Sequence, residues 1–185
     1  MAPLIRDAEP QDAATIADIY NQGIAERGAT FETEPRSEDD IAARLLDESR
    51  FPLLVAEDAG VVIGWAGLSR YRSRPCYDGI AEFSIYLDRA ARGRGVGRIL
   101  LDALVDVARQ RGYWKLVSRI FPFNTASRAL CRACGFREVG VYKNHGRLDD
   151  QWLDVVIVER VIPENLKVTG AAATPEPNTT GFKQE

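Results

Sequence analysis

The hydrophobic positions of this 185-residue chain change their spacing several times, and each change predicts a new secondary-structure element. Short apolar or alternating runs bounded by glycine, proline or acidic residues predict β-strands. Ala59 and Gly60 separate two such runs and therefore predict a tight hairpin turn. The predicted strands cover residues 4–6, 52–58, 61–71, 79–87, 114–121, 136–143 and 152–162.

Apolar residues three and four positions apart predict helices between these strands. The first begins near residue 10, and the second follows Ser37, which has Asp40 three residues on, as in a capping box. The last lies between Asn124, a predicted N-cap, and Gly135, a predicted C-terminal stop. The long central helix has an apolar stripe of Val96, Ile99, Leu100, Ala103, Leu104, Val107 and Ala108.

The order of these elements predicts a mixed α/β (α+β) domain. Hairpins come first, and a strand–helix–strand crossover follows in the middle of the chain. We expect one folded domain over residues 3–162, because this length suits a single hydrophobic core. Residues 169–185 have few large apolar side chains and two prolines, so they predict a disordered tail.

Composition and charge narrow the classes of function. The chain is 45% hydrophobic and 28% charged, as in ordinary globular proteins, and its net charge is −3. An acidic balance argues against nucleic acid or an anionic membrane as the main partner. The sequence shows neither a membrane-spanning apolar run nor a signal peptide, so we expect a cytoplasmic protein.

Three cysteines are present, and an odd number suits a reducing compartment. Cys131 and Cys134 form a Cys-x-x-Cys pair within a predicted helix. A redox or zinc site would need an activated thiolate or a second pair of ligands, and the sequence offers only one histidine. We therefore favour helix packing for this pair and predict no metal site.

The stretch ARGRGVGRILL, residues 91–101, carries the strongest chemical signal. A glycine-rich loop that enters a helix predicts a bound phosphate, because its N–H groups can approach an anion at the positive helix end. A P-loop would need Gly-Lys-Ser/Thr, which the chain lacks. A dinucleotide fingerprint would place its third glycine one residue later. Both of these better-known phosphate loops are excluded.

The pattern Arg92-x-x-Gly95-x-Gly97, after a strand that carries Glu82, resembles the acetyl-CoA motif of the GNAT acetyltransferase superfamily. The resemblance implies the GNAT fold, a mixed and mostly antiparallel sheet flanked by helices, with a central strand–loop–helix site for acetyl-CoA. Arginines in and around the loop would add positive charge for a pyrophosphate, although a solvated helix start is the alternative for them. The cofactor-contacting residues that the resemblance implies are Ile85, Tyr86, Leu87, Arg92, Gly93, Arg94, Gly95, Val96, Gly97, Arg98, Asn124 and Ser127.

Other stretches resemble one group in this superfamily, the phosphinothricin and arsinothricin N-acetyltransferases. They are NQGIAERGATFETEPRS, YRSRPCYDGIAEFSIYL and KNHGRLDDQWLDVVIVER. The group acetylates small glutamate analogues, whose anionic groups suit guanidinium partners. This implies a small amino-acid substrate and a homodimer; a charged loop with packing aromatics is the alternative for the site. The implied substrate-binding residues are Thr30, Phe31, Arg72, Arg74 and Tyr77.

The resemblance assigns the general base to Glu82. We expect its carboxylate to be buried in the sheet, where loss of hydration favours proton uptake; a structural pairing with arginine is the alternative. His145 stands where relatives have a histidine that helps to activate the amine, and extra residues before Trp152 leave an exposed loop as the alternative. Backbone N–H groups near Tyr86 would polarise the thioester carbonyl. Cys131 replaces the tyrosine that often protonates the leaving thiolate, so that role does not transfer.

The sequence therefore predicts an acetyl-CoA-dependent N-acetyltransferase that acts on a phosphinothricin-like or arsinothricin-like amino acid and confers resistance to it. One alternative is the same fold acting on a protein N-terminus or another small amine. A less favoured alternative is an acyl-CoA-binding module without catalysis.

Overall fold

A computed structural model describes residues 2–46 and 51–166 of the chain. The expected tail, residues 169–185, lies outside the described residues. The strands are β1 (Leu4–Asp7), β2 (Leu53–Asp58), β3 (Val61–Arg70), β4 (Ile80–Leu87), β5 (Lys115–Ile120), β6 (Arg137–Leu148) and β7 (Gln151–Val161). The helices are α1 (Ala13–Ala25), α2 (Glu38–Leu46), α3 (Val96–Gln110) and α4 (Thr125–Ala133). Short 3-10 turns cover Pro10–Asp12, Pro75–Tyr77, Arg89–Ala91 and Pro163–Asn165.

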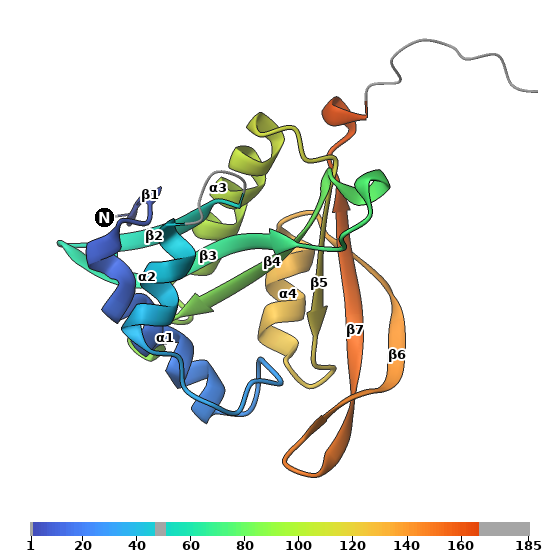
Figure 1. Ribbon diagram of the computed structural model, residues 1–185, viewed down its shortest axis with the longest axis horizontal. Helices are drawn as coiled ribbons and strands as arrows, with labels where there is room; N and C mark the ends of the chain where they lie inside the picture. The colour runs from blue at the N-terminus through green and yellow to red at the C-terminus, as the bar shows by residue number, and fades with distance from the viewer. Residues whose placement is uncertain (1, 47–50, 167–185) are drawn as a thin grey trace, which may run out of the picture.

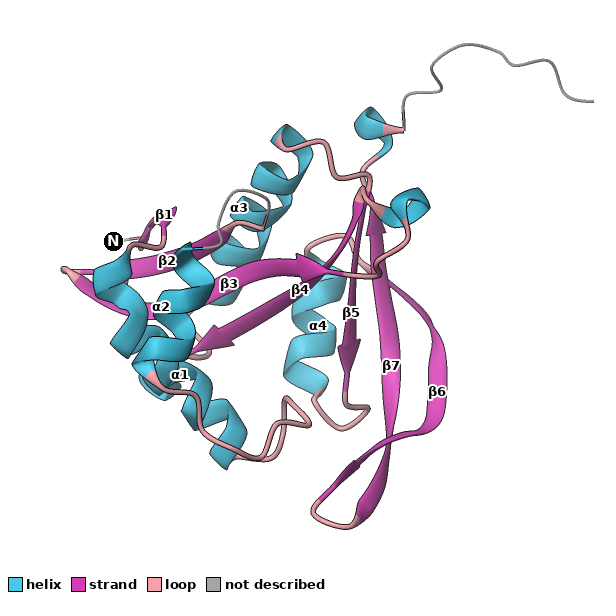
Figure 2. Cartoon of the chain, viewed as in Figure 1, coloured by secondary structure: helices cyan, strands magenta, loops and turns pink. Residues whose placement is uncertain are grey.

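The seven strands form one mixed sheet in the order β1-β2-β3-β4-β5-β7-β6. Every neighbouring pair is antiparallel except β4 and β5, which are parallel. Helices α1 and α2 cover one face of the sheet, and α3 and α4 cover the other (Figures 1 and 2). The predicted mixed α/β fold with a mostly antiparallel sheet is confirmed.

Each face of the sheet has its own hydrophobic core. Trp65 and Val55 point toward Ile16 of α1 and Ile41 of α2. On the opposite face, Leu68, Ala81 and Phe83 pack against the buried side of α3, which includes Leu100 and Leu104. The alternation in β4 follows from this arrangement, since Ala81 and Phe83 are buried among apolar side chains while Glu82 lies on the other side of the strand.

Several local predictions are confirmed at the level of backbone geometry. Ala59 and Gly60 both have positive φ, 52° and 81°, as a tight β2–β3 turn requires. Ser37 and Asp40 exchange the two hydrogen bonds of a capping box at the start of α2, with N···O distances of 2.8 and 3.1 Å. Asn124 caps α4 by accepting a hydrogen bond from the Ser127 N–H.

The stripe predicted for α3 is only partly right. Leu100 and Leu104 are fully buried, but Ile99 is 39% exposed. Leu101 and Val105, which lie outside the predicted stripe, are buried instead. Because α3 lies across the centre of the sheet and also contacts α4, it buries a wider and slightly rotated face than the sequence spacing suggests.

Strand β6 extends beyond its predicted end at residue 143 and includes His145. Most of its side chains are exposed because it forms an edge of the sheet, so no hydrophobic alternation marks its second half. Its register against β7 is interrupted between Tyr142 and Gly146, and Asn144 has a positive φ of 48°. A β-bulge therefore accommodates the extra residues before Trp152.

Strands β4 and β5 pair only over a short stretch. Residues 80–82 face residues 115–117, after which β4 continues alongside β3 to Leu87 and β5 turns away (Figure 1). The sheet is thus open in its middle on the side toward the C-terminal end of β4. This opening places backbone groups and side chains of both strands around one space.

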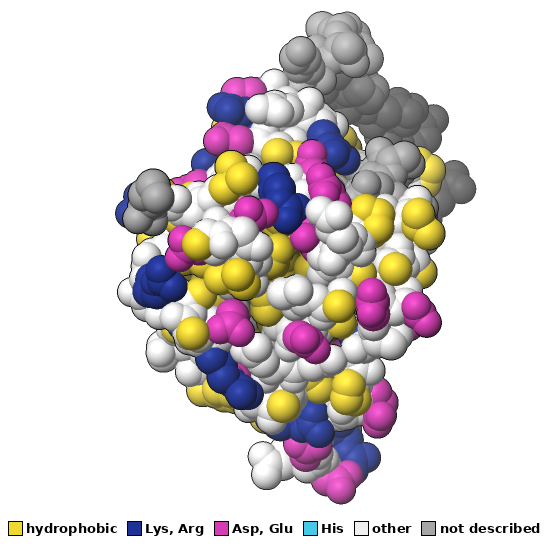
Figure 3. Space-filling model, turned by 90° about the vertical axis from the view of Figure 1, so that its left-hand side faces the viewer, with side chains coloured by type: hydrophobic (Ala, Val, Ile, Leu, Met, Phe, Trp, Pro, Cys, Tyr) yellow, Lys and Arg dark blue, Asp and Glu magenta, His cyan; other side chains and the backbone are white. Residues whose placement is uncertain are grey.

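None of the helices in the two described ranges is long and apolar enough to cross a bilayer. On the face seen in Figure 3, basic and acidic side chains alternate with apolar ones rather than gathering by sign. That face offers a polyanion no continuous basic surface.

Replacing Leu104 by alanine tests the α3 core. Because Leu104 is fully buried, Leu104→Ala should lower the free energy of unfolding by about 2–5 kcal/mol, measured by urea denaturation. Ile99→Ala on the exposed side of the same helix is the matched control and should cost less than about 1 kcal/mol. Equal losses for the two variants would contradict the observed orientation of α3.

Candidate active site

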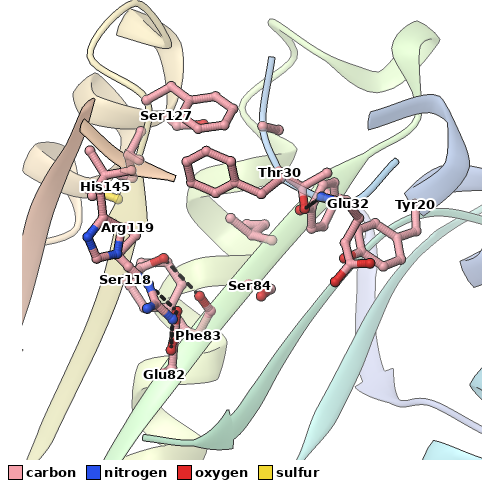
Figure 4. Close-up of a pocket in the computed structure, with 18 residues that line it drawn as sticks. Tyr20, Thr30, Glu32, Glu82, Phe83, Ser84, Ser118, Arg119, Ser127 and His145 are labelled. Atoms are coloured by element: carbon pink, nitrogen blue, oxygen red, sulfur yellow. Dashed lines mark hydrogen bonds and ion pairs between the residues drawn. The ribbon is translucent and has the colours of Figure 1, made fainter. Parts of the chain in front are cut away.

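The opening between β4 and β5 forms a cavity of about 390 Å³. Strand β4 supplies residues 82–86 to its wall, and β5 with the following turn supplies residues 118–121. The rest of the lining comes from α1 and the loop after it, from α4, and from one residue each of β6 and β7 (Figure 4). A concave site with a few polar groups among apolar ones is the usual form of a small-molecule site.

The backbone of β4 presents unpaired groups to this cavity. The Phe83 carbonyl points toward β5, where it accepts a hydrogen bond of 3.0 Å from the Ser118 hydroxyl. The Asp88 N–H points the other way and bonds to β3. Since alternate residues of a strand direct their N–H and C=O groups to the same side, the N–H groups of Ile85 and Leu87 face the opening. The separation of β4 from β5 therefore leaves the Leu87 N–H directed into the opening, whereas the Tyr86 N–H points toward β3.

Glu82 lies at the point where β4 and β5 separate, but the expected burial of its carboxylate is not found. Its side chain is 22% exposed, and the Arg119 guanidinium contacts both carboxylate oxygens at 2.5 Å (Figure 4). Sequence analysis missed Arg119. It stands two residues beyond Val117, the register partner of Glu82, so only the parallel pairing of β4 with β5 would have identified it.

His145 lies on strand β6 rather than in a loop, and its exposed side chain lines the same cavity as Glu82. The bulge in β6 holds it there, because the carboxylate of Asp154 ion-pairs with Lys143 and accepts a hydrogen bond from the Asn144 N–H. The imidazole also lies 5.2 Å from the ring of Tyr142, measured between centroids. The His145 side chain thus approaches the cavity from the wall opposite α1 (Figure 4).

Thr30 and Phe31, predicted to cover the substrate, both line the cavity. Phe31 packs edge-on against Phe121, with ring centroids 4.8 Å apart, and its ring fills the space beside Gly146. Thr30 contacts the hydroxyl of Tyr86, whose pKa is raised because the phenol is buried. The loop after α1 is therefore fastened on both sides of the opening.

The arginines and tyrosine predicted to bind substrate divide into two sets. Arg72 lines a smaller adjoining pocket of about 120 Å³, together with Glu82 and Arg119. Arg74 and Tyr77 line neither of these two cavities. Arg74 is exposed at the start of the 3-10 turn, and Tyr77 packs edge-on against Tyr71. The structure therefore brings only Arg72 of this group to the site.

The glycines of the loop between β4 and α3 have different roles. Gly93 and Gly95 have φ values of 75° and 82°, and nothing lies within 4 Å of a Cβ built on either. They are needed for backbone conformation. A Cβ on Gly97 would lie 3.2 Å from Leu130 and 3.3 Å from Leu87, so this glycine allows α3 to approach its neighbours.

The N-terminus of α3 remains a suitable anion cradle. The first helical N–H groups have no acceptor within the helix, and the first bonds back to the Gly95 carbonyl come from Arg98 and Ile99. The space beside Gly93 and Gly95 is open. Buried Val96 anchors the start of the helix in the core. A pyrophosphate could thus approach the backbone closely.

The arginines of this loop contribute less free charge than expected. Arg92 donates to Glu26 at 2.8 Å and to the Leu87 carbonyl at 3.2 Å. Arg94 pairs with Asp58 at 3.0 Å, and Arg98 lies 3.7 Å from Asp102 on its own helix. Each is partly exposed, so it can exchange its carboxylate for another anion at small cost.

Asn124 and Ser127, both predicted to contact the cofactor, have different positions in the structure. The Asn124 side chain accepts from the Ser127 N–H at 3.1 Å and donates to the Gly28 carbonyl at 3.0 Å. It therefore caps α4 and ties it to the loop after α1. Ser127 lines the cavity, as do Ile85 and Tyr86, whereas the Leu87 side chain packs near Gly97.

Cys131 lines the cavity. Its side chain is 2% exposed, and burial raises the pKa of the thiol to about 12. Burial also raises the pKa of Cys134 to about 12. The described residues contain no cluster of three or more His, Cys, Asp or Glu side chains that could hold a metal. The pair is part of the α3–α4 core.

Comparisons with known proteins support the predicted family and fold. The model of the Acetyltransferase (GNAT) family matches residues 16–136. The L-methionine sulfoximine/L-methionine sulfone acetyltransferase of Salmonella typhimurium is 33% identical over 166 residues, which cover 87% of this chain and 95% of that protein.

Two solved structures have closely similar folds. A phosphinothricin acetyltransferase from Sinorhizobium meliloti, in complex with AcCoA, has a TM-score of 0.83 and 35% identity, covering 96% of this chain and 95% of that one. The ribosomal-protein-alanine N-acetyltransferase from Brucella melitensis also has a TM-score of 0.83, with 34% identity and coverages of 86% and 99%.

The burial of two thiols can be checked by labelling with a disulfide reagent at mildly alkaline pH. Cys76 is exposed and should react at once, whereas Cys131 and Cys134 should stay protonated and react only after denaturation. Cys76→Ser is the control and should abolish the fast phase. Rapid labelling of a second thiol in the native protein would contradict the environment described for α4.

Proposed function

The chain belongs to the acetyltransferase (GNAT) family, and on that premise we propose that it acetylates the α-amino group of a small amino acid. The substrate class is a glutamate analogue with a phosphinate, sulfoximine or arsinate head group, whose toxicity acetylation would abolish. One observation carries the proposal: Glu82 and His145 face the open edge of β4 within a single cavity. The names of the methionine sulfoximine and phosphinothricin relatives support this class.

Acetyl-CoA supplies the acetyl group as an activated thioester. The residues present fit this molecule, because the open backbone at Gly93 and Gly95 leads into the N-terminus of α3. That loop would hold the pyrophosphate through backbone N–H groups. Arg92, Arg94 and Arg98 surround the loop and can add charge by leaving their carboxylate partners.

Glu82 and His145 would handle the proton of the attacking amine. An α-amino group is mostly protonated near neutral pH, so it must lose a proton before it can act as a nucleophile. Both side chains line the cavity beside the unpaired edge of β4, Glu82 from β4 and His145 from β6. We assign proton acceptance to Glu82 and orientation of the amine to His145.

The N–H groups of Ile85 and Leu87 would stabilise charge on the carbonyl oxygen. They face the opening and are fixed by the pairing of β4 with β3, so they need no reorganisation during the reaction. Cys131 is a poor proton donor, since burial raises its pKa to about 12, well above that of an ordinary thiol. The CoA thiolate, released when the C–S bond breaks, would therefore take its proton from solvent.

A protein N-terminus is the second candidate acceptor, supported by the structural likeness to the ribosomal-protein-alanine N-acetyltransferase. The guanidinium groups of Arg72 and Arg119 beside Glu82 favour a free amino acid, since a peptide N-terminus lacks the adjacent carboxylate. A homodimer and a cytoplasmic location remain predictions.

Thiol release from acetyl-CoA, measured against a panel of amines, tests the proposed function. We expect turnover with phosphinothricin, arsinothricin or methionine sulfoximine, weak turnover with glutamate, and little with an alanine-terminated peptide. Turnover of the peptide alone would support the second candidate. Tight binding of CoA without turnover of any amine would contradict catalysis and indicate a binding module.

Glu82→Gln tests the assignment of the base. The amide keeps the shape of the side chain but cannot accept a proton, so kcat should fall by a factor of about 100 or more at neutral pH. Glu138→Gln is the matched control, because Glu138 also pairs with an arginine but lines neither cavity. Near-full activity of Glu82→Gln would contradict the assignment.

A further inference from the structure

Arg119 is the cation closest to the proposed base, and it lies at the junction of the two cavities. Its Nε is 3.0 Å from a Glu82 carboxylate oxygen, and its Nη2 reaches both oxygens at 2.5 Å. The guanidinium lines the main cavity and the adjoining pocket alike. It therefore faces whatever occupies the space beside Glu82.

We propose that Arg119 and Glu82 together recognise the charged α-carbon end of the amino-acid substrate. Arg119 takes the α-carboxylate, and Glu82 takes the α-amino group and later its proton. This inference rests on the proposed function and adds the residue that restricts the acceptor to free α-amino acids.

The chemistry of the acceptor supports this pairing. In an α-amino acid the amino nitrogen and the carboxylate are attached to the same carbon, so their binding partners must also be neighbours. Glu82 and Arg119 are such neighbours, with opposite charges in direct contact. A bound zwitterion would replace one ion pair by two charge-assisted contacts, and a guanidinium can hold the carboxylate bidentately.

The exposure of the pair allows this exchange. The side chain of Arg119 is 48% exposed, and ion pairs at such exposure contribute little to stability. The comparable pair between Arg128 and Glu138, with distances of 2.9 and 3.0 Å, lines neither cavity. The reason to assign substrate recognition to Arg119 is therefore its position in the lining of both cavities, since Arg128 forms a similar ion pair elsewhere.

The adjoining pocket then suits the other end of the substrate. Arg72 lines it with Tyr71 and Tyr142, and its guanidinium lies over the Tyr71 ring, 5.2 Å from the centroid. Arg72 is absent from the lining of the main cavity, so it is placed for a group farther from the amine. If Arg119 binds the α-carboxylate, Arg72 is available to bind the anionic head group.

The test compares phosphinothricin with its α-carboxamide, which keeps the amine and head group but removes the α-carboxylate charge. We expect the wild-type protein to prefer the free acid in kcat/KM by roughly 10- to 100-fold. Arg119→Gln should lower kcat/KM for the free acid by about that factor, mainly through KM, and leave the carboxamide almost unchanged. Arg119→Lys keeps the charge without the bidentate geometry and should restore part of the preference.

Arg128→Gln is the matched control and should retain the wild-type preference, with thermal unfolding confirming that every variant folds. If Arg119 has a purely structural role, Arg119→Gln should lower kcat/KM for the free acid and the carboxamide by the same factor, and this result would overturn the inference. A variant Arg119→Gln that keeps the wild-type preference for the free acid would overturn it as well. If the wild-type protein acetylates the peptide but neither phosphinothricin compound, the proposed function fails and the inference fails with it.

Discussion

The site depends on the place where β4 and β5 stop pairing. Up to residue 82 the two strands pair as ordinary parallel strands, and beyond it the only strand that pairs with the backbone of β4 is β3. The unpaired edge supplies N–H groups, the diverging strands create the cavity, and the last paired position holds Glu82. The two cores on opposite faces of the sheet fix β3, β4 and α3 relative to one another, so the opening is a rigid feature of the fold.

The charges around this opening follow one arrangement. The arginines of the glycine-rich loop and Arg119 all form ion pairs with carboxylates, and all of these guanidinium groups are partly exposed. Such pairs keep the guanidinium groups in position and can still be exchanged for the anionic groups of ligands. By contrast, burial raises the pKa of the thiols of Cys131 and Cys134, so Cys131 adds apolar surface rather than reactivity to the cavity.

The sequence predicted the elements well because their signals are local. The spacing of hydrophobic residues, the positions of glycines and the capping residues each depend on only a few neighbouring residues. The structure confirms the predicted cap at Asn124. Long-range features were harder to predict. The pairing of Glu82 with Arg119 needs the β4–β5 register, and the continuation of β6 to His145 has no hydrophobic signal because the strand is an exposed edge. Arg74 and Tyr77 were assigned to the site by resemblance, whereas the local turn directs them elsewhere.

Amide hydrogen exchange along β4, followed residue by residue by NMR, tests the central claim most directly. In the free protein Ser84 and Tyr86 should exchange slowly, because they bond to β3, whereas Ile85 and Leu87 should exchange quickly. Adding acetyl-CoA should slow Ile85 and Leu87 selectively. Equal protection of all four amides in the free protein, or no change at Ile85 and Leu87 on binding, would contradict the claim that this open edge is the acetyl-transfer site.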